Sequence, residues 1–261
     1  MSTPEAIRVW ESSLAGYKRI WRSNLVGSLV QPVLYLLGMG VGVGALVDQR
    51  GQSADVLGGV SYLAFLGPAL IATTAMLVLA QEAMWPVMNG FEWSNVYRAM
   101  YATPLDPGDI AAGTALWQAT RGLIVSGGVA LALLLFDDTR TWGLLPAVAF
   151  GVLTGIAISL PITAWSASRE AGDQSFPAIM RFGVMPMILF AGAFYPIDQL
   201  PTWLQPVAWV TPLWHGVELC RGAVLGTLDV VDVVLHGGVL VAFILAGYLS
   251  ARRIYARRLA R

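Results

Sequence analysis

Residues 60–81 read VSYLAFLGPALIATTAMLVLAQ, a run of 22 residues without a charged side chain. A helix needs roughly 20 mostly apolar residues to cross a lipid bilayer. Similar runs recur along the 261-residue chain and predict six spans, at residues 25–47, 60–81, 110–136, 143–165, 176–195 and 231–250. The sequence therefore predicts an all-α polytopic membrane protein with little chain left for a soluble domain.

The composition agrees with this fold class. Hydrophobic residues make up 56% of the chain and charged residues 12%, about half of the 25% that is typical of a soluble domain. The 16 basic and 16 acidic residues balance, so the net charge gives no reason to expect a nucleic-acid partner. The only cysteine, Cys220, excludes a disulfide within the chain.

The distribution of basic residues predicts the orientation, because short loops rich in Lys and Arg stay in the cytoplasm. With both termini inside, three basic residues fall outside, namely Arg50, Arg140 and Arg221. The cytoplasmic segments then hold eleven: Arg8, Lys18, Arg19, Arg22, Arg98, Arg169, Arg252, Arg253, Arg257, Arg258 and Arg261. We therefore expect a multi-pass protein of the plasma membrane with both termini cytoplasmic.

An amphipathic helix is predicted before the first span, within residues 1–23. Its apolar side recurs at helical spacing, through Ile7, Trp10, Leu14, Tyr17 and Trp21. Such a helix suits the plane of the cytoplasmic headgroups. It also fits an ordinary amphipathic helix that packs against a neighbouring helix.

The longest cytoplasmic loop follows the second span, and its sequence predicts a short helix at 91–102. The helix is expected to end before Thr103-Pro104, because the residue before a proline disfavours helical dihedral angles. Aromatic and Arg side chains are typical of protein interfaces, so this helix is a candidate docking site for a cytoplasmic partner. The alternative is that its rings pack against lipid and the N-terminal helix. The candidate docking residues are Phe91, Glu92, Trp93, Asn95, Val96, Tyr97, Arg98, Met100 and Tyr101.

Three charged residues lie within or beside the predicted spans: Glu82, Arg121 and Arg181. Charges inside a membrane are costly and are usually paired or functional. We therefore expect Glu82 to lie near Arg121 or Arg181. The apolar part of the third span begins only at Gly122, so Arg121 is expected to extend toward the inner headgroups.

The segment 196–230 is too apolar for a free loop and too rich in proline for a span. It predicts short helices in or along the outer leaflet, where backbone groups must be satisfied by protein. Within it, Glu218 and Arg221 are spaced to pair on one helix face.

No catalytic or metal-binding motif is evident in the sequence. His215 and His236 are the only histidines, and the single lysine, Lys18, is followed by Arg19 and not by the Ser or Thr of a phosphate-binding loop. Acidic residues inside the spans are nearly absent, so no proton relay is predicted either. If the chain moves a substrate uphill, we expect the energy to come from another protein.

The complete pattern resembles the membrane subunit of type-2 ABC exporters. Within that group it is most similar to lipooligosaccharide (nodulation-factor) export permeases and to antibiotic-export permeases of actinobacteria. The local match is to the pattern FPxxQLP…PLxHxxxLxR…G, with Tyr at 195 where Phe is usual. It comprises Tyr195, Pro196, Ile197, Asp198, Gln199, Leu200, Pro201, Pro212, Leu213, His215, Glu218, Arg221, Leu225 and Gly226.

The resemblance implies that residues 1–261 form a single transmembrane domain. Residues 1–23 would be an elbow helix, 91–102 a coupling helix, 196–230 short external helices that shape the exit, and 251–261 a basic cytoplasmic tail. It also implies a homodimer in a bacterial inner membrane, joined to two copies of a separate ATPase that binds ATP and Mg. The cargo would be a lipid-linked saccharide or a hydrophobic drug. The external gate residues would be Tyr195, Pro196, Asp198, Gln199, Leu200, Pro201, Pro212, His215, Glu218 and Arg221.

Two other classes remain as alternatives. A secondary carrier driven by an ion gradient needs ion-coupling residues and often has inverted repeats, and the sequence shows no convincing repeat. A membrane scaffold without transport activity needs only packing surfaces.

Overall fold

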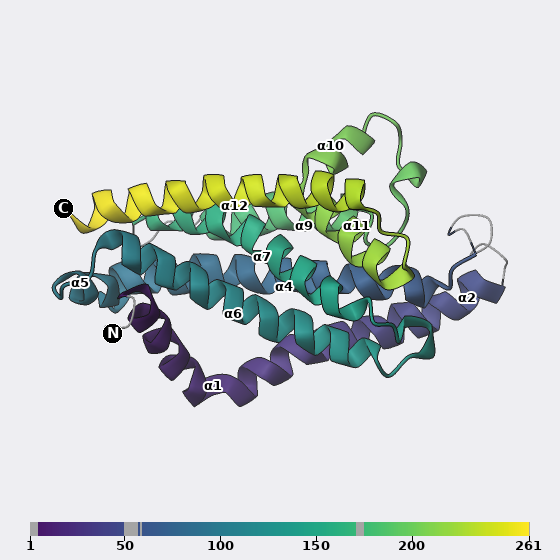
Figure 1. Ribbon diagram of the computed structural model, residues 1–261, viewed down its shortest axis with the longest axis horizontal. Coiled ribbons are helices and arrows are strands. Elements are labelled where there is room, and N and C mark those ends of the chain that lie inside the picture. The colour runs from purple at the N-terminus through teal and green to yellow at the C-terminus, as the bar shows by residue number, and fades with distance from the viewer. Residues whose placement is uncertain (1–4, 50–56, 58, 171–174, 261) are drawn as a thin grey trace.

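The computed structural model describes residues 5–49, 57, 59–170 and 175–260. This part of the chain is an elongated bundle whose long helices run along a common axis (Figure 1). Helix α5, the beginning of α1 and the end of α12 lie at one end, which we call the α5 end. Helices α2 and α10 and the beginning of α12 lie at the other, which we call the α10 end.

The first half of the chain forms one long helical path along the bundle and two further long helices. Its elements are α1 (Glu5–Tyr35), η1 (Leu36–Val43, a π-helix), α2 (Gly44–Gln49), α4 (Tyr62–Met88), η2 (Asn89–Trp93, a π-helix), α5 (Val96–Tyr101), α6 (Pro107–Leu133) and η3 (Asp137–Thr139).

The second half alternates long helices with short ones. Its elements are α7 (Leu144–Ala167), α8 (Ser175–Ile179), η4 (Met180–Val184, a π-helix), α9 (Met185–Phe190), η5 (Ile197–Gln199), α10 (Gln205–Val210), α11 (Pro212–Leu225) and α12 (Val230–Leu259). The described residues contain no strand, which confirms the all-α class.

In the described part of the chain, five helical segments are long and apolar enough to cross a membrane, whereas six spans are predicted. They are Val30–Val47, Tyr62–Trp93, Pro107–Leu133, Leu144–Ala167 and Val230–Leu259. The predicted fifth span, 176–195, corresponds to the shorter apolar segment Ser175–Phe190. Sixteen residues at 1.5 Å each reach about 24 Å, which is less than the ~30 Å hydrocarbon core.

The predicted boundary between the elbow helix and the first span is not a helix end. Helix α1 continues from Glu5 to Tyr35, although Figure 1 shows it changing direction partway along its length. Its first turns pack against α6, where Val9 is buried. A Cβ at Gly113 of α6 would collide with Val9, so this close approach requires glycine. Trp10 also donates a hydrogen bond to Thr120 at 2.9 Å.

The second span and the loop after it also differ from the prediction. Helix α4 and η2 continue without a break to Trp93, beyond the predicted end at 81. The helix predicted at 91–102 is divided at Asn95, which has a φ of 52°. Asn tolerates this left-handed conformation better than most residues do. Only α5 forms a separate short helix after this break.

Helix α4 lies at the centre of the bundle, and α12 lies on the surface of the bundle. In the apolar windows of the two helices, 83% of the α4 residues are buried but only 17% of the α12 residues. The outward side chains of α12 are nevertheless apolar, including Val230, Val234 and Leu245. An apolar surface of this kind is expected where lipid replaces water as the solvent.

The C-terminal segment is a continuation of α12 and not a separate tail. Asp229 and Asp232 form a capping box at the start of the helix, with the Asp232 N–H donating to Asp229 at 2.8 Å. The helix then continues to Leu259, so most of the predicted tail at 251–261 is helical, and Arg261 lies outside the described residues.

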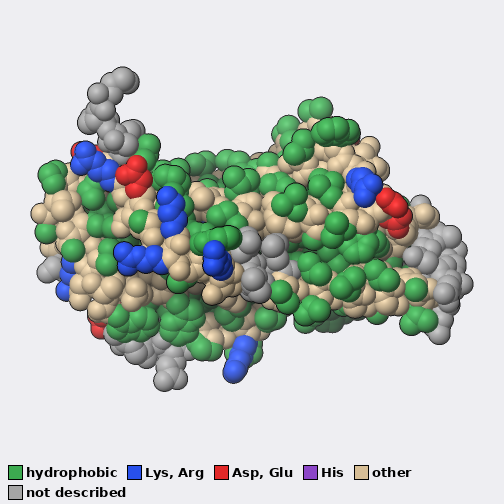
Figure 2. Space-filling view, turned by 90° about the horizontal axis from the view of Figure 1, so that it is seen from below, with side chains coloured by type: hydrophobic (Ala, Val, Ile, Leu, Met, Phe, Trp, Pro, Cys, Tyr) green, Lys and Arg blue, Asp and Glu red, His purple; other side chains and the backbone are tan. Residues whose placement is uncertain are grey.

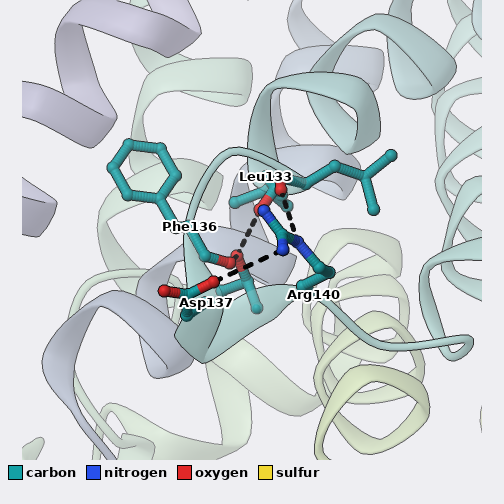
Figure 3. Close-up of polar contacts among 6 residues, drawn as sticks. Leu133, Phe136, Asp137 and Arg140 are labelled. Atoms are coloured by element: carbon teal, nitrogen blue, oxygen red, sulfur yellow. Dashed lines mark hydrogen bonds and ion pairs between the residues drawn. The ribbon is translucent and has the colours of Figure 1, made fainter.

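The turn after α6 closes the α10 end (Figure 3). The Thr139 hydroxyl donates to the Leu133 carbonyl at 2.7 Å, and Arg140 Nε donates to the Leu134 carbonyl at 3.0 Å. Arg140 also lies 3.5 Å from Asp137. These contacts satisfy carbonyls that the end of a helix leaves without partners.

Charged side chains are unevenly distributed over the surface. In Figure 2, Lys and Arg gather over the half of the molecule that holds the α5 end, and the other half of this face shows few of them. Of the three basic residues predicted outside, Arg140 and Arg221 lie at the α10 end, and Arg50 is outside the described residues.

Candidate functional site

The α5 end is built around three aromatic rings. The Phe91 ring lies 4.8 Å from both Tyr97 and Tyr255, and the two tyrosine rings lie 5.4 Å apart. Phe91 and Tyr255 are buried, and burial raises the pKa of Tyr97 above 10.0. The cluster joins η2, α5 and the end of α12. We did not predict Tyr255, although its four-residue spacing from the buried Ala251 and Leu259 is a helical core pattern.

An ion pair strengthens the same junction. Arg258 of α12 pairs with Glu92 of η2 and donates a hydrogen bond to the Ala167 carbonyl at 2.6 Å. Its guanidinium also lies 4.4 Å from the centre of the Phe91 ring. Because both charged side chains are largely buried, salt screens this pair less than a surface pair.

The candidate docking residues divide into two groups. Phe91, Glu92, Tyr97 and Met100 face the bundle and are buried or half-buried. None of the six residues of α5 is fully buried. The exposed members of the set are Trp93, Asn95, Val96, Arg98 and Tyr101.

The structure brings two of the three candidate membrane charges together. Glu82 Oε2 lies 3.8 Å from Arg121 Nε, and Trp117 Nε1 donates to Glu82 Oε1 at 2.7 Å. The Arg121 side chain lies over the Tyr17 ring at 4.7 Å and is 4% exposed. Arg121 thus packs within protein and does not extend outward as predicted. Arg181 is on η4, with an exposed side chain.

Two cavities meet at this pair. The smaller, about 590 Å³, lies beside α5 and has mixed walls that include the polar Ser12, Ser13, Asn89, Ser94, Thr114 and Gln118 and the apolar Val9, Val87 and Met100. The larger, about 1000 Å³, is bordered by α1, α4 and α9 and has mostly apolar walls that include Leu70, Leu77, Val78, Met185, Ile188 and Leu189. Four residues line both cavities: Asn24, Glu82, Pro86 and Arg121.

The predicted external segment contains one helix that is not at the surface. We expected short helices in or along the outer leaflet, yet α11 packs against α4, α7 and α12. Thr211 accepts a hydrogen bond from Trp214 N–H at its start, and Gly226, with a φ of 71°, ends it. That left-handed conformation explains the glycine of the sequence motif.

Arg221 connects α11 to two other elements of the α10 end. It donates to Glu218 at 2.9 Å, to the Gly192 carbonyl at 2.7 Å and to the Phe65 carbonyl at 3.3 Å. Its guanidinium lies 3.7 Å from the Phe65 ring centre. The expected Glu218–Arg221 pair is present, and Arg221 is also buried, so it holds α4, α11 and the end of α9 together.

His215 and His236 form a second buried link. His215 Nε2 lies 2.9 Å from the Trp209 carbonyl, and the two Nδ1 atoms lie 2.7 Å apart. Because a carbonyl only accepts, His215 donates through Nε2, and its Nδ1 accepts from His236. No spacing in the sequence predicts the contact of His236 with His215.

The other candidate gate residues are spread over the segment before α11. The Tyr195 hydroxyl donates to the Leu189 carbonyl at 2.7 Å. Pro196 precedes η5, whose Ile197 is buried with Leu200. Asp198, Gln199 and Pro201 are exposed, whereas Pro212 is buried at the start of α11.

These features define a class of protein. Long apolar helices form the bundle, its buried charges line cavities, and an exposed short helix lies at one end. The described residues contain no group of three or more potential metal ligands. The combination is that of a multi-pass membrane transport protein.

The comparison with known proteins identifies the family. The chain belongs to the ABC-2 type transporter family, whose model matches residues 6–225. It is 32% identical over 258 residues to nodulation protein J of Rhizobium leguminosarum bv. trifolii, covering 98% of this chain and 94% of the relative. It is 26% identical over 244 residues to the inner membrane transport permease YadH of Escherichia coli, covering 92% and 90%.

Proposed function

We propose that this chain is the permease subunit of an ATP-driven exporter that moves an amphiphilic molecule out of the cytoplasm or the inner leaflet. ATP and Mg bind to a separate ATPase subunit, two copies of which join two copies of this chain. The single observation that carries the proposal is the family membership over residues 6–225. The exposed helix α5 at one end of the bundle is consistent with it.

The proposed orientation places the α5 end in the cytoplasm of a bacterial cell and the α10 end outside. The support is the excess of basic residues in the loops and helix ends at the α5 end, which favours the cytoplasmic side. Both termini are then cytoplasmic, and α10 and α11 lie toward the outer leaflet.

The proposed contact with the ATPase is the exposed surface of α5, together with Trp93 at the end of η2. Trp93 is 55% exposed and Tyr101 41%, and exposed aromatic side chains are typical anchors of interfaces. Val96, Tyr97 and Met100 also line the smaller cavity. A displacement of α5 by the ATPase would therefore change the shape of that cavity directly.

The proposed cargo is a lipid-linked saccharide, as in a lipooligosaccharide, or a hydrophobic drug. The support is the larger cavity, whose apolar walls also carry polar side chains such as Gln31, Thr73 and Gln81. A cavity of this mixed character suits a ligand with both an apolar and a polar part.

The test is co-expression with the ATPase encoded nearest to the gene. The proposal expects the two proteins to copurify and ATP to drive export from proteoliposomes. Transport that follows an ion gradient without ATP would show a secondary carrier. Failure to copurify with the ATPase, with no transport, would support a scaffold.

A cross-link test then locates the contact. Cys220 is buried, and burial raises the pKa of its thiol, so an added surface cysteine reacts selectively. Val96→Cys is expected to cross-link to the ATPase, and Val230→Cys, which is exposed near the α10 end, is not. The opposite pattern would overturn the docking assignment.

A further inference from the structure

Arg121 combines a charged side chain, deep burial and an unpaired hydrogen-bond donor. It is 4% exposed, yet its Nη1 atom is buried without a hydrogen-bond partner. Leaving a donor of a charged group unpaired is costly, and structures usually avoid it. Arg121 also borders both cavities, so a turn of its guanidinium would let this donor give a hydrogen bond to a ligand bound there.

The nearest counter-ion does not fully pair with Arg121. Glu82 Oε2 lies 3.8 Å from Arg121 Nε, which is beyond a normal hydrogen bond. The other oxygen of Glu82 accepts from Trp117 at 2.7 Å. The neutral Gln118 nearby is engaged with Thr163 and Ser159. Arg121 therefore keeps part of its capacity for an acceptor with negative charge.

The position of Arg121 explains which ligand would supply that acceptor. It lies where the small cavity of mixed polarity meets the large, mostly apolar cavity. Among the described residues that line the two cavities, only Glu82 and Arg121 carry a charge. An oxyanion at Arg121 would thus have hydroxyl and amide groups among the walls on one side and room for an apolar chain on the other.

We infer that Arg121 binds the acidic headgroup of an amphiphile, such as a phosphate, sulfate or carboxylate, while the apolar tail of the same molecule occupies the larger cavity. Arg is suited to this contact because its planar fork binds oxyanions through paired hydrogen bonds. Glu82 acts as the resident counter-ion, which the headgroup displaces from Arg121. This inference rests on the proposed export of an amphiphile and names the acidic class of cargo or lipid.

The test measures binding of dodecyl phosphate to the full chain purified in dodecyl maltoside, by isothermal titration. No ATPase is required, so a failure here is separate from a failure of ATP-driven transport. Arg121→Gln is expected to weaken binding by about tenfold or more, because one charge-assisted contact is lost. Arg121→Lys, which keeps the charge, is expected to restore part of the affinity.

A second variant acts in the opposite direction and keeps the test decisive if Arg121→Gln fails to fold. Glu82→Gln preserves the shape of the side chain and an acceptor for Trp117 but removes the competing charge. It is expected to bind dodecyl phosphate more tightly than the wild type. Arg140→Gln, on an exposed arginine at the other end of the bundle, is the matched control and is expected to leave the affinity unchanged.

Two further measurements separate the headgroup from the tail. Inorganic phosphate alone is expected to bind much more weakly than dodecyl phosphate, and equal binding would show a site for free anions with no role for the larger cavity. Val78→Trp, which fills part of the larger cavity, is expected to weaken the binding of dodecyl phosphate and to leave the binding of inorganic phosphate unchanged. Wild-type affinity in both Arg121→Gln and Glu82→Gln would overturn the inference.

Discussion

Helices α5 and α11 are both too short to cross a bilayer, and they lie at opposite ends of the bundle (Figure 1). Ten of the 14 residues of α11 are buried, and none of the six residues of α5 is. Helix α11 is fixed by packing on α4 and α7 and by the hydrogen bonds of Arg221. Helix α5 is held at its base by Phe91 and Tyr97 and leaves its outer surface open.

The difference shows where stability and coupling are expected to reside. Substitutions of the buried residues of α11 should destabilise the fold, because they leave buried groups without partners. Substitutions on the outer surface of α5 should leave the fold intact and affect only contacts with a partner. Four experiments test this contrast, and three of them compare one variant with a control of similar chemistry.

The largest effect is expected for Arg221→Met. The change removes the donor to the Gly192 carbonyl and a second donor to the Phe65 carbonyl of α4, and a buried unpaired acceptor costs about 1–3 kcal/mol. We expect the free energy of unfolding to fall by about 2–4 kcal/mol in total. Denaturation in mixed micelles measures it. The control is Arg140→Met, at an arginine whose side chain is 60% exposed, and an equal loss in both variants would refute the structural role.

A smaller loss is expected for Glu92→Gln at the base of α5. Arg258 would keep its hydrogen bond to the Ala167 carbonyl and its contact with the Phe91 ring but lose its charged partner. We expect a cost of about 1–2 kcal/mol, since the pair is only partly solvated. Glu11→Gln, on an exposed residue of α1, should change stability very little. Full stability of Glu92→Gln would mean that the aromatic rings alone hold this junction.

The histidine link at the α10 end predicts a pH dependence. Burial, together with His236, lowers the pKa of His215 below 6.5. The unfolded chain therefore takes up a proton before the folded chain does, so stability is complete above pH 6.5 and decreases as the pH falls below it. The slope should not exceed about 1.4 kcal/mol per pH unit for one proton.

The measurement is unfolding at pH values from 7.5 to 5.5, with His215→Asn as the comparison. The variant should lose the part of the slope that belongs to His215. If the wild type and the variant show the same slope, the histidine pair does not contribute to the pH dependence.

The sequence was sufficient to predict the helical bundle because the apolar runs are long and nearly free of charge. It was less reliable for the ends of helices. Residues 89–93 continue α4 as a π-helix, and residues 251–259 continue α12. The two segments have the composition of a loop and a tail, but Phe91 of one packs against Tyr255 of the other and stabilises both as helix. Local composition does not contain that information.

The candidate site shows the same limit. The spacing of Glu218 and Arg221 predicted their pairing, because a helix brings residues three apart together. The contacts of Arg221 with Phe65 and Gly192 join segments far apart in the chain, and no single-sequence pattern encodes them. Likewise, the placement of Arg121 between two cavities depends on how α1 crosses α6, which is set by packing at Gly113.

The smallest effect on stability is expected for Val96→Ser on α5. Val96 is 40% exposed, so the change in unfolding free energy should stay within about 0.5 kcal/mol. If α5 is the contact with the ATPase, the same variant should reduce the ATPase activity that transport substrate stimulates in the complex. Val230→Ser, which is 78% exposed near the α10 end, is the control for loss of an exposed valine. Stimulated activity that is normal in Val96→Ser and reduced in Val230→Ser would reverse the roles assigned to the two ends, because the exposed residue that matters would then lie far from α5.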